Sequence, residues 1–436
     1  MFTSYGQAVD WIHSRLRLGI KPGLRRMEWM LERLEHPERK LKTIHIGGTN
    51  GKGSTVTFLS SILQAAGYHV GTFTSPYFEH FNERISINGK AASDEEIVQL
   101  VNVIKPLADE LESTELGGPT EFEVITAMSM YYFAHIQPSD VVIYEVGLGG
   151  RFDSTNVIHP LLSIITSIGM DHTSILGDTI EEIAFEKAGI IKNGVSIISG
   201  VRQPEALSVI KERAAAIKAP LYQLGKDFTV DSALPLQMGT RFDFQSLFGS
   251  YGKLELRMMG EHQAANASLA VMAAQILSSY YSFLIEEQDI RDGLNNAYWP
   301  GRFEVLSESP LVVIDGAHNE EGIEALAKEV ESRYRDKHKE ILFGALKDKK
   351  LDGMIAKLDS LSDDIVFTSF DFPRAAGAEE LFDISQSLNK RVEEDWKSFL
   401  EQAITNRNQK DLLLITGSLY FLSEAKPFIK ELLDKK

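Results

Sequence analysis

The most informative stretch of the chain reads Gly47-Gly48-Thr49-Asn50-Gly51-Lys52-Gly53-Ser54. An apolar run at residues 43–46 precedes it and predicts a buried strand, whereas residues 54–66 have the length and period of a helix. Glycines let backbone N–H groups face phosphate oxygens, and a helix N-terminus adds the positive end of its dipole. We therefore predict a phosphate-binding loop, in which Lys52 reaches the terminal phosphates.

The loop departs from the common pattern G-x-x-x-x-G-K-[ST]. Position 46 is Ile rather than Gly, and Gly53 separates Lys52 from the hydroxyl of Ser54. A flexible glycine turn is the alternative interpretation. The context of the stretch favours phosphate binding, because a strand–loop–helix unit places the loop amides at a helix N-terminus.

Apolar runs of strand length alternate with segments of helical length along most of the chain. Short buried strands that alternate with helices predict mainly parallel sheets covered on both faces, so the predicted fold class is α/β. The predicted strands are residues 43–46, 69–74, 141–146, 161–168, 195–199, 311–315, 341–345, 365–369 and 412–416, and three of the predicted helices are residues 54–66, 320–334 and 379–388.

The length of 436 residues exceeds one ordinary hydrophobic core, and about 150 residues per domain gives two or three domains. We place a boundary at Tyr298-Trp299-Pro300-Gly301-Arg302, where Pro and Gly interrupt the pattern. This predicts an N-terminal phosphate-loop domain of residues 1–298 and a smaller, Rossmann-like α/β domain of residues 299–436. Residues 225–256 are less helical and predict a small β subregion in the first domain.

Composition and charge exclude several classes of protein. Lys and Arg number 45 against 62 Asp and Glu, a net charge of −17 that repels polyphosphate backbones, so we expect no nucleic-acid partner. The absence of cysteine excludes disulfides, thiolate nucleophiles and iron–sulfur clusters. The first residues lack the apolar core of a secretory signal, and polar side chains are scattered through the uncharged residues 263–285. We therefore expect a cytoplasmic protein with no membrane span.

A candidate metal site comes from the ends of three predicted strands. Glu145 interrupts an apolar strand near its carboxyl end, and Ser75 and His172 each follow another strand. These ends face the ligand crevice of an open parallel sheet, where a buried carboxylate is costly unless it binds a cation or hydrogen-bond donors. Taken singly, each side chain is equally well explained as structural, and magnesium prefers oxygen ligands to the imidazole of His172.

Lys187 has apolar neighbours three and four residues away on either side. If the helix continues past Gly189, the lysine stem lies along an apolar stripe. Desolvation favours the neutral amine, which can react with carbon dioxide. A lysine that extends its ammonium group to solvent is the alternative interpretation.

The loop sequence G-T-N-G-K-G-S resembles the variant phosphate loop of the Mur-ligase-like, ATP-dependent amide ligases. The chain looks most like their folate branch, the folylpolyglutamate synthase/dihydrofolate synthase family. The similarity runs in order through nearly the whole chain, and it includes Thr74-Ser75-Pro76, Glu145-Val146-Gly147-Leu148-Gly149-Gly150-Arg151, Gly169-Met170-Asp171-His172, Glu186-Lys187-Ala188-Gly189, His262-Gln263-Ala264-Ala265-Asn266-Ala267, Pro300-Gly301-Arg302, Asp315-Gly316-Ala317-His318-Asn319 and Thr416-Gly417-Ser418.

The resemblance implies a reaction and its cofactors. ATP would phosphorylate the terminal glutamyl carboxylate of a reduced folate, and the amine of L-glutamate would attack the acyl phosphate; dihydropteroate stays open as a second acceptor. The implied ATP-binding residues are Thr49, Asn50, Gly51, Lys52, Gly53, Ser54, Asn266, Arg302 and Asp315. The implied ligands of two Mg²⁺ ions are Ser75, Glu145 and His172.

The resemblance also assigns roles to two further side chains. Lys187 would be carboxylated and place an anion beside the metals, so Lys52, Lys187 and His318 are the candidate catalytic residues. His318 would orient phosphate or the reacting carboxylate, and a histidine of purely structural role in a turn is the alternative. We expect a monomer.

For the pterin ring of the substrate, the family points to two segments, Thr120-Glu121-Phe122-Glu123 and Phe152-Asp153-Ser154. Phe122 and Phe152 can stack on an aromatic ring, and Asp153 can accept N–H bonds. Many relatives read G-R-L-D-A-T-N where this chain reads G-R-F-D-S-T-N, so the transfer of individual pterin contacts is weaker than that of the other motifs.

Three other functions remain open from the sequence. A peptidoglycan-precursor ligase of the same superfamily is the nearest, and the short segment before the phosphate loop argues against it. An unrelated phosphate-loop kinase or ATPase is disfavoured by the altered loop pattern and by the D-G-A-H-N series. A non-catalytic nucleotide-binding regulator would have no need for Ser75, Glu145, His172 and Lys187 together.

Overall fold

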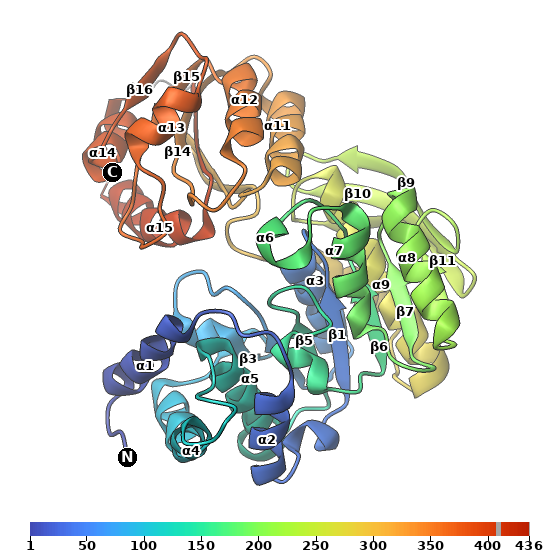
Figure 1. Ribbon diagram of the computed structural model, residues 1–436. Helices are drawn as coiled ribbons and strands as arrows, with labels where there is room; N and C mark the ends of the chain where they lie inside the picture. The colour runs from blue at the N-terminus through green and yellow to red at the C-terminus, as the bar shows by residue number, and fades with distance from the viewer. Residues whose placement is uncertain (407–410, 436) are drawn as a thin grey trace. The chain divides into compact units, whose positions relative to one another are not determined.

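The computed structural model describes residues 1–406 and 411–435 of the chain (Figure 1). They form two compact units, each with its own sheet and hydrophobic core. The first unit comprises Met1–Leu234, Arg241–Arg257 and Gln263–Ala297. The second comprises Pro235–Thr240, Met258–His262 and Tyr298–Lys436, so it contains two short segments that precede its main part in the chain.

The first unit is built on a mainly parallel sheet. Its strands are β1 (Thr43–Gly47), β2 (Val70–Phe73), β3 (Ile85–Ile87), β4 (Lys90–Ala91), β5 (Val141–Glu145), β6 (Leu162–Ile165), β7 (Ser196–Ser199) and β8 (Leu221–Gln223). The strand order is β4-β3-β2-β5-β1-β6-β7-β8, and only the edge formed by β3 and β4 is antiparallel. Because β1 lies in the middle of the parallel part, the loop that follows it opens at the centre of the sheet's carboxyl edge.

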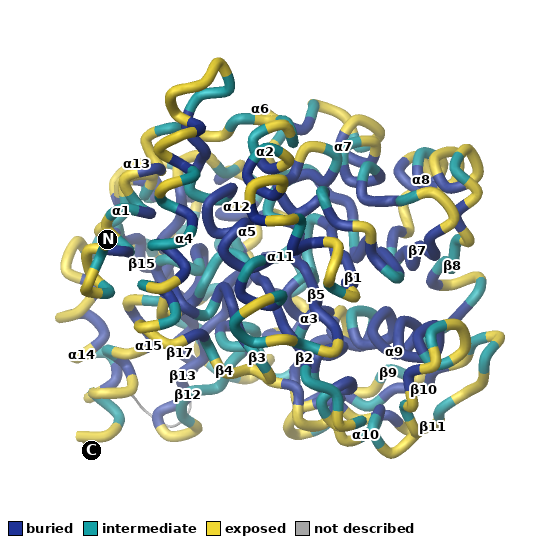
Figure 2. Tube along the Cα trace, turned by 90° about the horizontal axis from the view of Figure 1, so that it is seen from below, coloured by how far each residue is buried: buried dark blue, intermediate teal, exposed yellow. Residues whose placement is uncertain are grey.

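Helices cover both faces of this sheet. On one face, α1 (Tyr5–His13), α2 (Arg25–Arg33), α4 (Asp94–Glu112) and α5 (Glu121–Tyr131) bury apolar side chains against β2 and β5, while α7 (Ile180–Lys187) and α8 (Pro204–Ala216) pack beside β6 and β7. On the other face, α3 (Lys52–Ala65) packs against β1, β2 and β5, and α10 (Glu287–Asn296) packs against α3. Figure 2 shows β1, β5 and the long helix α9 (Glu261–Tyr281) in the colour of buried residues.

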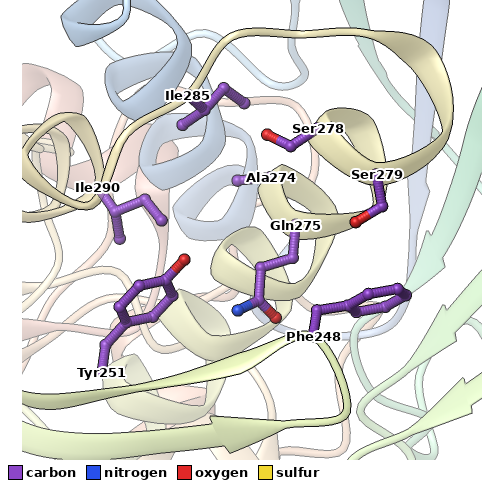
Figure 3. A pocket seen from close by; sticks show the side chains of 8 residues that line it. All are labelled: Phe248, Tyr251, Ala274, Gln275, Ser278, Ser279, Ile285 and Ile290. Carbon is purple, nitrogen blue, oxygen red and sulfur yellow. The ribbon is translucent and has the colours of Figure 1, made fainter.

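A small three-stranded sheet follows β8. It consists of β9 (Phe228–Pro235), β10 (Thr240–Ser246) and β11 (Gly249–Leu256) in the order β11-β10-β9. The β subregion predicted for residues 225–256 is therefore confirmed. A cavity of about 110 Å³ lies between β11, α9 and α10, and its lining includes Tyr251, Gln275 and Ile290 (Figure 3). No residue predicted as functional from the sequence lines this cavity.

The second unit holds a six-stranded sheet. Its strands are β12 (Glu304–Glu308), β13 (Leu311–Asp315), β14 (His338–Phe343), β15 (Asp364–Phe367), β16 (Lys390–Val392) and β17 (Asp411–Thr416), in the order β12-β13-β17-β14-β15-β16. Only the pair of β12 and β13 is antiparallel. The helices are α11 (Glu320–Tyr334), α12 (Leu351–Leu361), α13 (Ala378–Ile384), α14 (Trp396–Asn406) and α15 (Leu419–Asp434). This arrangement confirms the predicted α/β class for both sheets.

Each of the nine predicted strands overlaps an observed strand, but two predicted elements extend several residues beyond the observed carboxyl end. The strand predicted at residues 161–168 ends at Ile165, and beyond it the hydroxyl groups of Thr166 and Ser167 donate to Asn50 O in another loop. The helix predicted at residues 379–388 ends at Ile384, and the Ser385 hydroxyl instead donates to Asp359 Oδ1 at 2.6 Å. Across the described residues, no helix combines the length and the hydropathy that a membrane crossing requires.

Candidate active site

The phosphate loop of the first unit joins β1 to α3, as the sequence predicts. Two positions of the loop require glycine, because the backbone there has a positive φ and neighbouring atoms leave no room for a Cβ. Gly48 has φ +149° and a Cβ there would lie 2.0 Å from Thr166 Oγ1, while Gly51 has φ +84° and a Cβ would lie 2.3 Å from Asn266 Oδ1. A side chain at either position would meet strain and a collision, so the loop can take this shape only with glycine.

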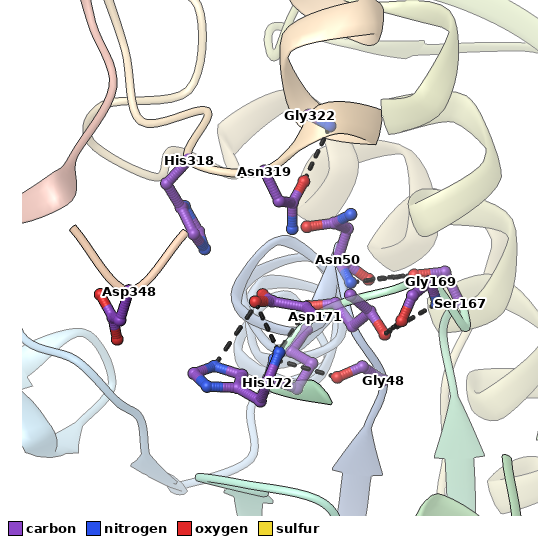
Figure 4. A network of polar contacts seen from close by, with 12 residues as sticks. Gly48, Asn50, Ser167, Gly169, Asp171, His172, His318, Asn319, Gly322 and Asp348 are labelled. Carbon is purple, nitrogen blue, oxygen red and sulfur yellow. Dashed lines mark hydrogen bonds and ion pairs between the residues drawn. The ribbon is translucent and has the colours of Figure 1, made fainter. Parts of the chain in front are cut away.

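The loop is fastened to the segment that follows β6 (Figure 4). The Thr49 N–H donates to Ser167 O and the Asn50 N–H to Ser167 Oγ, both at 2.9 Å. In return, Thr166 Oγ1 donates to Asn50 O at 2.6 Å, and the Gly169 N–H donates to Thr49 Oγ1 at 2.9 Å. These reciprocal bonds hold the loop in one shape before any phosphate binds, which lowers the ordering cost of binding.

Two lysines converge on this loop. Lys52 Nζ donates to the carbonyl oxygens of Gly48 and Thr49, each at 3.1 Å. Lys187 Nζ donates to the same Gly48 oxygen at 2.9 Å, although the two residues are separated by 139 positions. The fold thus places two ammonium groups on one carbonyl of the phosphate loop.

The environment of Lys187 favours its neutral form. Its side chain is only 5% exposed. Burial, and after it the positive charge of Lys52, lower the pKa of Lys187, while the negative charges of Asp171 and Asp153 raise it; the net result is a pKa of about 7. Near neutral pH a large fraction of Lys187 is therefore an unprotonated amine.

The helical stripe around Lys187 is expected only if the helix continues past Gly189, and this condition is not met. The α-helix ends at Lys187, and residues Ala188–Ile190 form a single turn of 3-10 helix. This turn packs closely on the chain after β5, because a Cβ on Gly189 would lie 2.3 Å from Arg151 Cα. The tertiary structure, rather than a continuous helix, buries the lysine.

Of the three proposed metal ligands, the structure brings two into contact. The Ser75 N–H donates to Glu145 Oε2 at 3.3 Å, and Glu145 is 4% exposed at the end of β5. His172 lies beside Asp171 instead, with 3.9 Å between His172 Nε2 and Asp171 Oδ2 (Figure 4). No cluster of three or more His, Asp or Glu side chains that could hold a metal ion occurs within residues 1–406 and 411–435. The hydroxyl of Ser75 and the carboxylate of Glu145 nevertheless supply the oxygen donors that Mg²⁺ prefers.

The first proposed substrate segment begins helix α5. Thr120 and Glu123 form a capping box, in which the Thr120 N–H donates to Glu123 Oε2 at 2.8 Å. The Glu123 carboxylate also pairs with Arg26 at 2.9 Å, so its position is fixed from two sides. Phe122 packs on Gly147, where a Cβ would lie 2.5 Å from the ring, and Glu121 lies 3.9 Å from His13.

In the second proposed substrate segment, one side chain is exposed to solvent and another is buried. Phe152 is 46% exposed, and the Arg151 guanidinium lies over its ring at 4.3 Å and over the Phe185 ring at 4.9 Å. Asp153 is buried and accepts the Leu148 N–H at 2.8 Å, and Ser154 begins the 3-10 helix η5 (Ser154–Val157).

Within the second unit, Asp315 ends β13 and accepts the N–H groups of Phe303 and Ala317, each at 2.8 Å. Burial raises the pKa of Asp315, and the positive charge of Arg302 opposes this shift. Arg302 Nε is buried and has no hydrogen-bond partner among the residues that the structure describes, which suits a residue that awaits an anionic ligand. His318 Nδ1 lies 2.8 Å from Gly316 O. Figure 4 also shows the cap of α11, where the Gly322 N–H donates to Asn319 Oδ1 at 2.9 Å.

The sequence reasoning missed the residues that hold the phosphate loop. Thr166 and Ser167 fall inside the predicted apolar strand, yet their hydroxyl groups bond to the backbone of Asn50. A signal was present, because two hydroxyl side chains interrupt that run at its carboxyl end, as Glu145 does in β5.

Comparison with known proteins decides the family. Residues 46–274 match the Mur ligase middle domain, and residues 301–419 match the Mur ligase, glutamate ligase domain. The dihydrofolate synthase/folylpolyglutamate synthase of Bacillus subtilis (strain 168) is 49% identical over 99% of this chain and 100% of its own length. The chain belongs to the folylpolyglutamate synthase/dihydrofolate synthase family of Mur ligases. The resemblance drawn from the sequence is thereby confirmed.

Solved structures agree with this assignment. The Mycobacterium tuberculosis folylpolyglutamate synthase in complex with ADP is 31% identical, with a TM-score of 0.89 over 98% of both chains. A folylpolyglutamate synthase in complex with AMPPCP and folate is 32% identical, with a TM-score of 0.84 over 99% of this chain and 100% of that one. At these identities the family's two-domain α/β architecture extends to this protein.

Proposed function

We propose that the protein adds L-glutamate to the terminal glutamyl carboxylate of reduced folates, using ATP, and that it also accepts dihydropteroate. The observation that carries the proposal is the meeting of Lys52 and Lys187 on Gly48, at the phosphate loop of a family member. This reading is preferred over a peptidoglycan-precursor ligase and over a non-catalytic regulator, because the relatives that match nearly the whole chain are folate ligases.

Amide formation needs an activated carboxylate, since hydroxide is a poor leaving group at neutral pH. In the proposed reaction the acceptor carboxylate attacks the γ-phosphorus of ATP, the bond to ADP breaks, and an acyl phosphate forms. The glutamate amine then attacks the acyl carbon, phosphate leaves, and the amine loses a proton. The protein contributes positioning, neutralisation of charge and exclusion of water.

Lys52 is proposed to stabilise the negative charge on the phosphoryl group during transfer. Its two acceptors, the carbonyls of Gly48 and Thr49, belong to the phosphate loop, so the ammonium group is already held beside the place where phosphate would bind. Thr49, Asn50, Gly51, Gly53 and Ser54 are proposed to donate loop amides or hydroxyls to the phosphates, and Asn266 to bind the nucleotide with Arg302 and Asp315.

The oxygen donors of Ser75 and Glu145 fit Mg²⁺, and they are proposed to hold it together with His172. Bound magnesium would neutralise charge on the ATP phosphates. Glu145 suits this role because a buried carboxylate is stabilised by a cation. We propose two such ions, as in the expectation from the sequence.

Lys187 is proposed to carry a carbamate. The nitrogen lone pair of the neutral amine would bond to the carbon of CO₂, and a proton would leave the nitrogen to give a carbamate anion. The pKa of about 7 makes the reactive form abundant at neutral pH. The alternative, a lysine that extends to solvent, does not fit a side chain that is 5% exposed.

For the folate ring, we propose stacking on Phe122 and Phe152 and hydrogen bonds to Thr120, Glu121, Glu123, Asp153 and Ser154. The exposed ring of Phe152 supports a stacking role. His318 is proposed to orient phosphate or the reacting carboxylate. We further propose a cytoplasmic monomer with domains at residues 1–298 and 299–436 and no nucleic-acid partner; size-exclusion chromatography with light scattering tests the monomer.

The deciding experiment measures ADP release by the purified protein with ATP, Mg²⁺ and tetrahydrofolate, with and without L-glutamate. We expect ADP release that requires glutamate and one added glutamyl residue per ADP, measured by mass spectrometry. Dihydropteroate replaces tetrahydrofolate in a second arm. No product with either acceptor, together with turnover of a muropeptide precursor, would move the protein to the peptidoglycan branch.

A further inference from the structure

His45 is a buried histidine in the strand that leads into the phosphate loop. It lies on β1 two residues before Gly47 and is 0% exposed. Burial lowers the pKa of His45 to about 3, and the positive charge of Lys192 adds to this shift, so the ring is neutral at physiological pH. None of the motifs that the sequence analysis assigned uses this residue.

A hydrogen-bonded chain connects His45 to Asp153. His45 Nε2 lies 2.8 Å from Thr155 Oγ1, and Thr155 Oγ1 in turn donates to Asp153 Oδ1. A threonine hydroxyl has one proton, and Thr155 donates it in the hydrogen bond to Asp153. The hydroxyl oxygen must therefore accept a hydrogen bond from the His45 ring. This assigns the proton of His45 to Nε2 and orders the donors as His45, then Thr155, then Asp153.

The carboxylate at the end of this chain holds a loop together. Asp153 also accepts the N–H groups of Leu148 at 2.8 Å and Thr155 at 3.0 Å, and so closes the turn after β5. Asn156 connects the same loop to the turn that follows Lys187, because its Nδ2 donates to Gly189 O at 3.1 Å. The loop contains Phe152, a proposed contact of the folate ring.

Burial of the histidine has a cost that an apolar residue would avoid. His45 Nδ1 is buried and has no hydrogen-bond partner within the described part of the chain. An isoleucine or leucine would fill a central strand without an unsatisfied nitrogen. The contact that distinguishes a histidine from an apolar residue at this position is the Nε2–H donated to Thr155.

We propose that His45 is a positioning residue, which acts through Thr155 and Asp153 to hold the loop of residues 147–156 in register with the phosphate loop. Strand β1 carries His45 and leads directly into the phosphate loop. The hydrogen bonds from His45 through Thr155 to Asp153 therefore connect the two loops. The proposal rests on the proposed function, since its consequence is the alignment of the folate acceptor with ATP.

The kinetic test compares two substitutions at His45. Gln can place its amide N–H near the position of Nε2, whereas Met fills a similar volume without a donor. We expect His45→Met to raise the KM for the folate acceptor about tenfold, the typical effect of losing one hydrogen bond in a charged chain, with the KM for ATP changed less than about twofold. His45→Gln should restore the folate KM to within about threefold of wild type.

A double substitution separates positioning from packing. Thr155→Val breaks the same chain one step later, so His45→Met and Thr155→Val together should raise the folate KM no more than the larger single effect. Multiplied effects, equal increases in both KM values, or a Gln variant as impaired as the Met variant would each overturn the proposal. A loss of melting temperature with unchanged KM values would assign His45 a merely structural role.

A spectroscopic test needs no activity and therefore separates this inference from the proposed function. In protein with ¹⁵N-labelled histidine, we expect His45 to show the neutral tautomer protonated at Nε2, with an N–H proton that exchanges slowly. Thr155→Val should shift that resonance and speed its exchange. A ring protonated at Nδ1, or a resonance that Thr155→Val leaves unchanged, contradicts the chain even if glutamate ligation is confirmed.

Discussion

Lys52 Nζ and Lys187 Nζ donate to a single carbonyl oxygen, that of Gly48, at 3.1 and 2.9 Å. Two ammonium groups on one acceptor repel each other, and the repulsion is smallest when one of them is neutral. Lys187 is the more deeply buried and its pKa falls to about 7. Lys187 is therefore available as an amine beside the side chain of Lys52.

Replacing Lys52 by alanine should reduce the chemical step far more than folate affinity. The ammonium charge matters most while the phosphoryl group is transferred, and one such contact contributes about 2.7–4 kcal/mol, or roughly a hundred- to thousandfold in kcat. The measurement is steady-state kinetics at saturating ATP, with the exposed residue Lys40 replaced by alanine as the control. Near-normal turnover of Lys52→Ala would contradict the assignment of the loop.

Lys187→Ala and Lys187→Arg should both lose most activity, because neither can carry a carbamate; arginine also retains its positive charge. High concentrations of a small carboxylate should partly restore the alanine variant. Wild-type protein incubated with ¹³C-bicarbonate should show a carbamate carbon resonance, and Lys187→Arg should not. An active arginine variant, or the same resonance in that variant, rules out the carbamate.

The stability of the protein should rise with pH because of Lys187. Its pKa is about 7 in the folded state against 10.5 for an ordinary lysine. Between these values the unfolded chain binds one more proton, so the contribution of the neutral amine grows with pH, is complete above the ordinary pKa, and is lost as the pH falls through 7. In CO₂-free buffer, the free energy of unfolding relative to Lys187→Met should increase by about 1.4 kcal/mol per pH unit at most. Urea unfolding at several pH values measures this difference, and a constant difference refutes the expectation.

Gly51→Ala should damage the protein more than Gly67→Ala, although the two glycines have nearly the same φ of +84° and +85°. A Cβ at Gly67 meets nothing within 4 Å, whereas one at Gly51 lies 2.3 Å from Asn266 Oδ1. Backbone strain of about 1 kcal/mol is common to both, and only Gly51→Ala adds the collision. Thermal unfolding and ADP binding are measured for both variants. Equal losses of melting temperature and of ADP affinity would show that backbone strain alone causes the damage and that the collision with Asn266 adds nothing.

Glu145→Gln should raise the Mg²⁺ concentration needed for half-maximal activity by about tenfold or more. Glutamine keeps an acceptor for the Ser75 N–H but removes the negative charge that holds the cation. The control is Glu115→Gln at an exposed position. Magnesium titrations at fixed ATP give the result, and an unchanged midpoint would remove Glu145 from the metal site.

The pattern of residues determined the elements and the family of this protein. Strand runs such as residues 311–315 and the helix at residues 320–334 appear in the structure with the same bounds, because buried strands and amphipathic helices depend on neighbours within a few positions. The phosphate loop was predictable for the same reason, since its glycines, lysine and helix N-terminus lie within eight residues.

Only the tertiary structure decided which distant side chains meet. Lys187 contacts Gly48 across 139 positions, and His45 contacts Thr155 across 110. These contacts depend on the order of strands in the sheet, which places β5 on one side of β1 and β6 on the other. No local periodicity encodes that order, and the buried Lys187 ammonium finds its acceptor, the Gly48 carbonyl, in a distant loop rather than in its own helix. The chemistry of the site therefore depends on contacts between residues that are distant in the sequence. A sequence pattern can single out each residue by itself, but only the folded sheet brings the residues into contact.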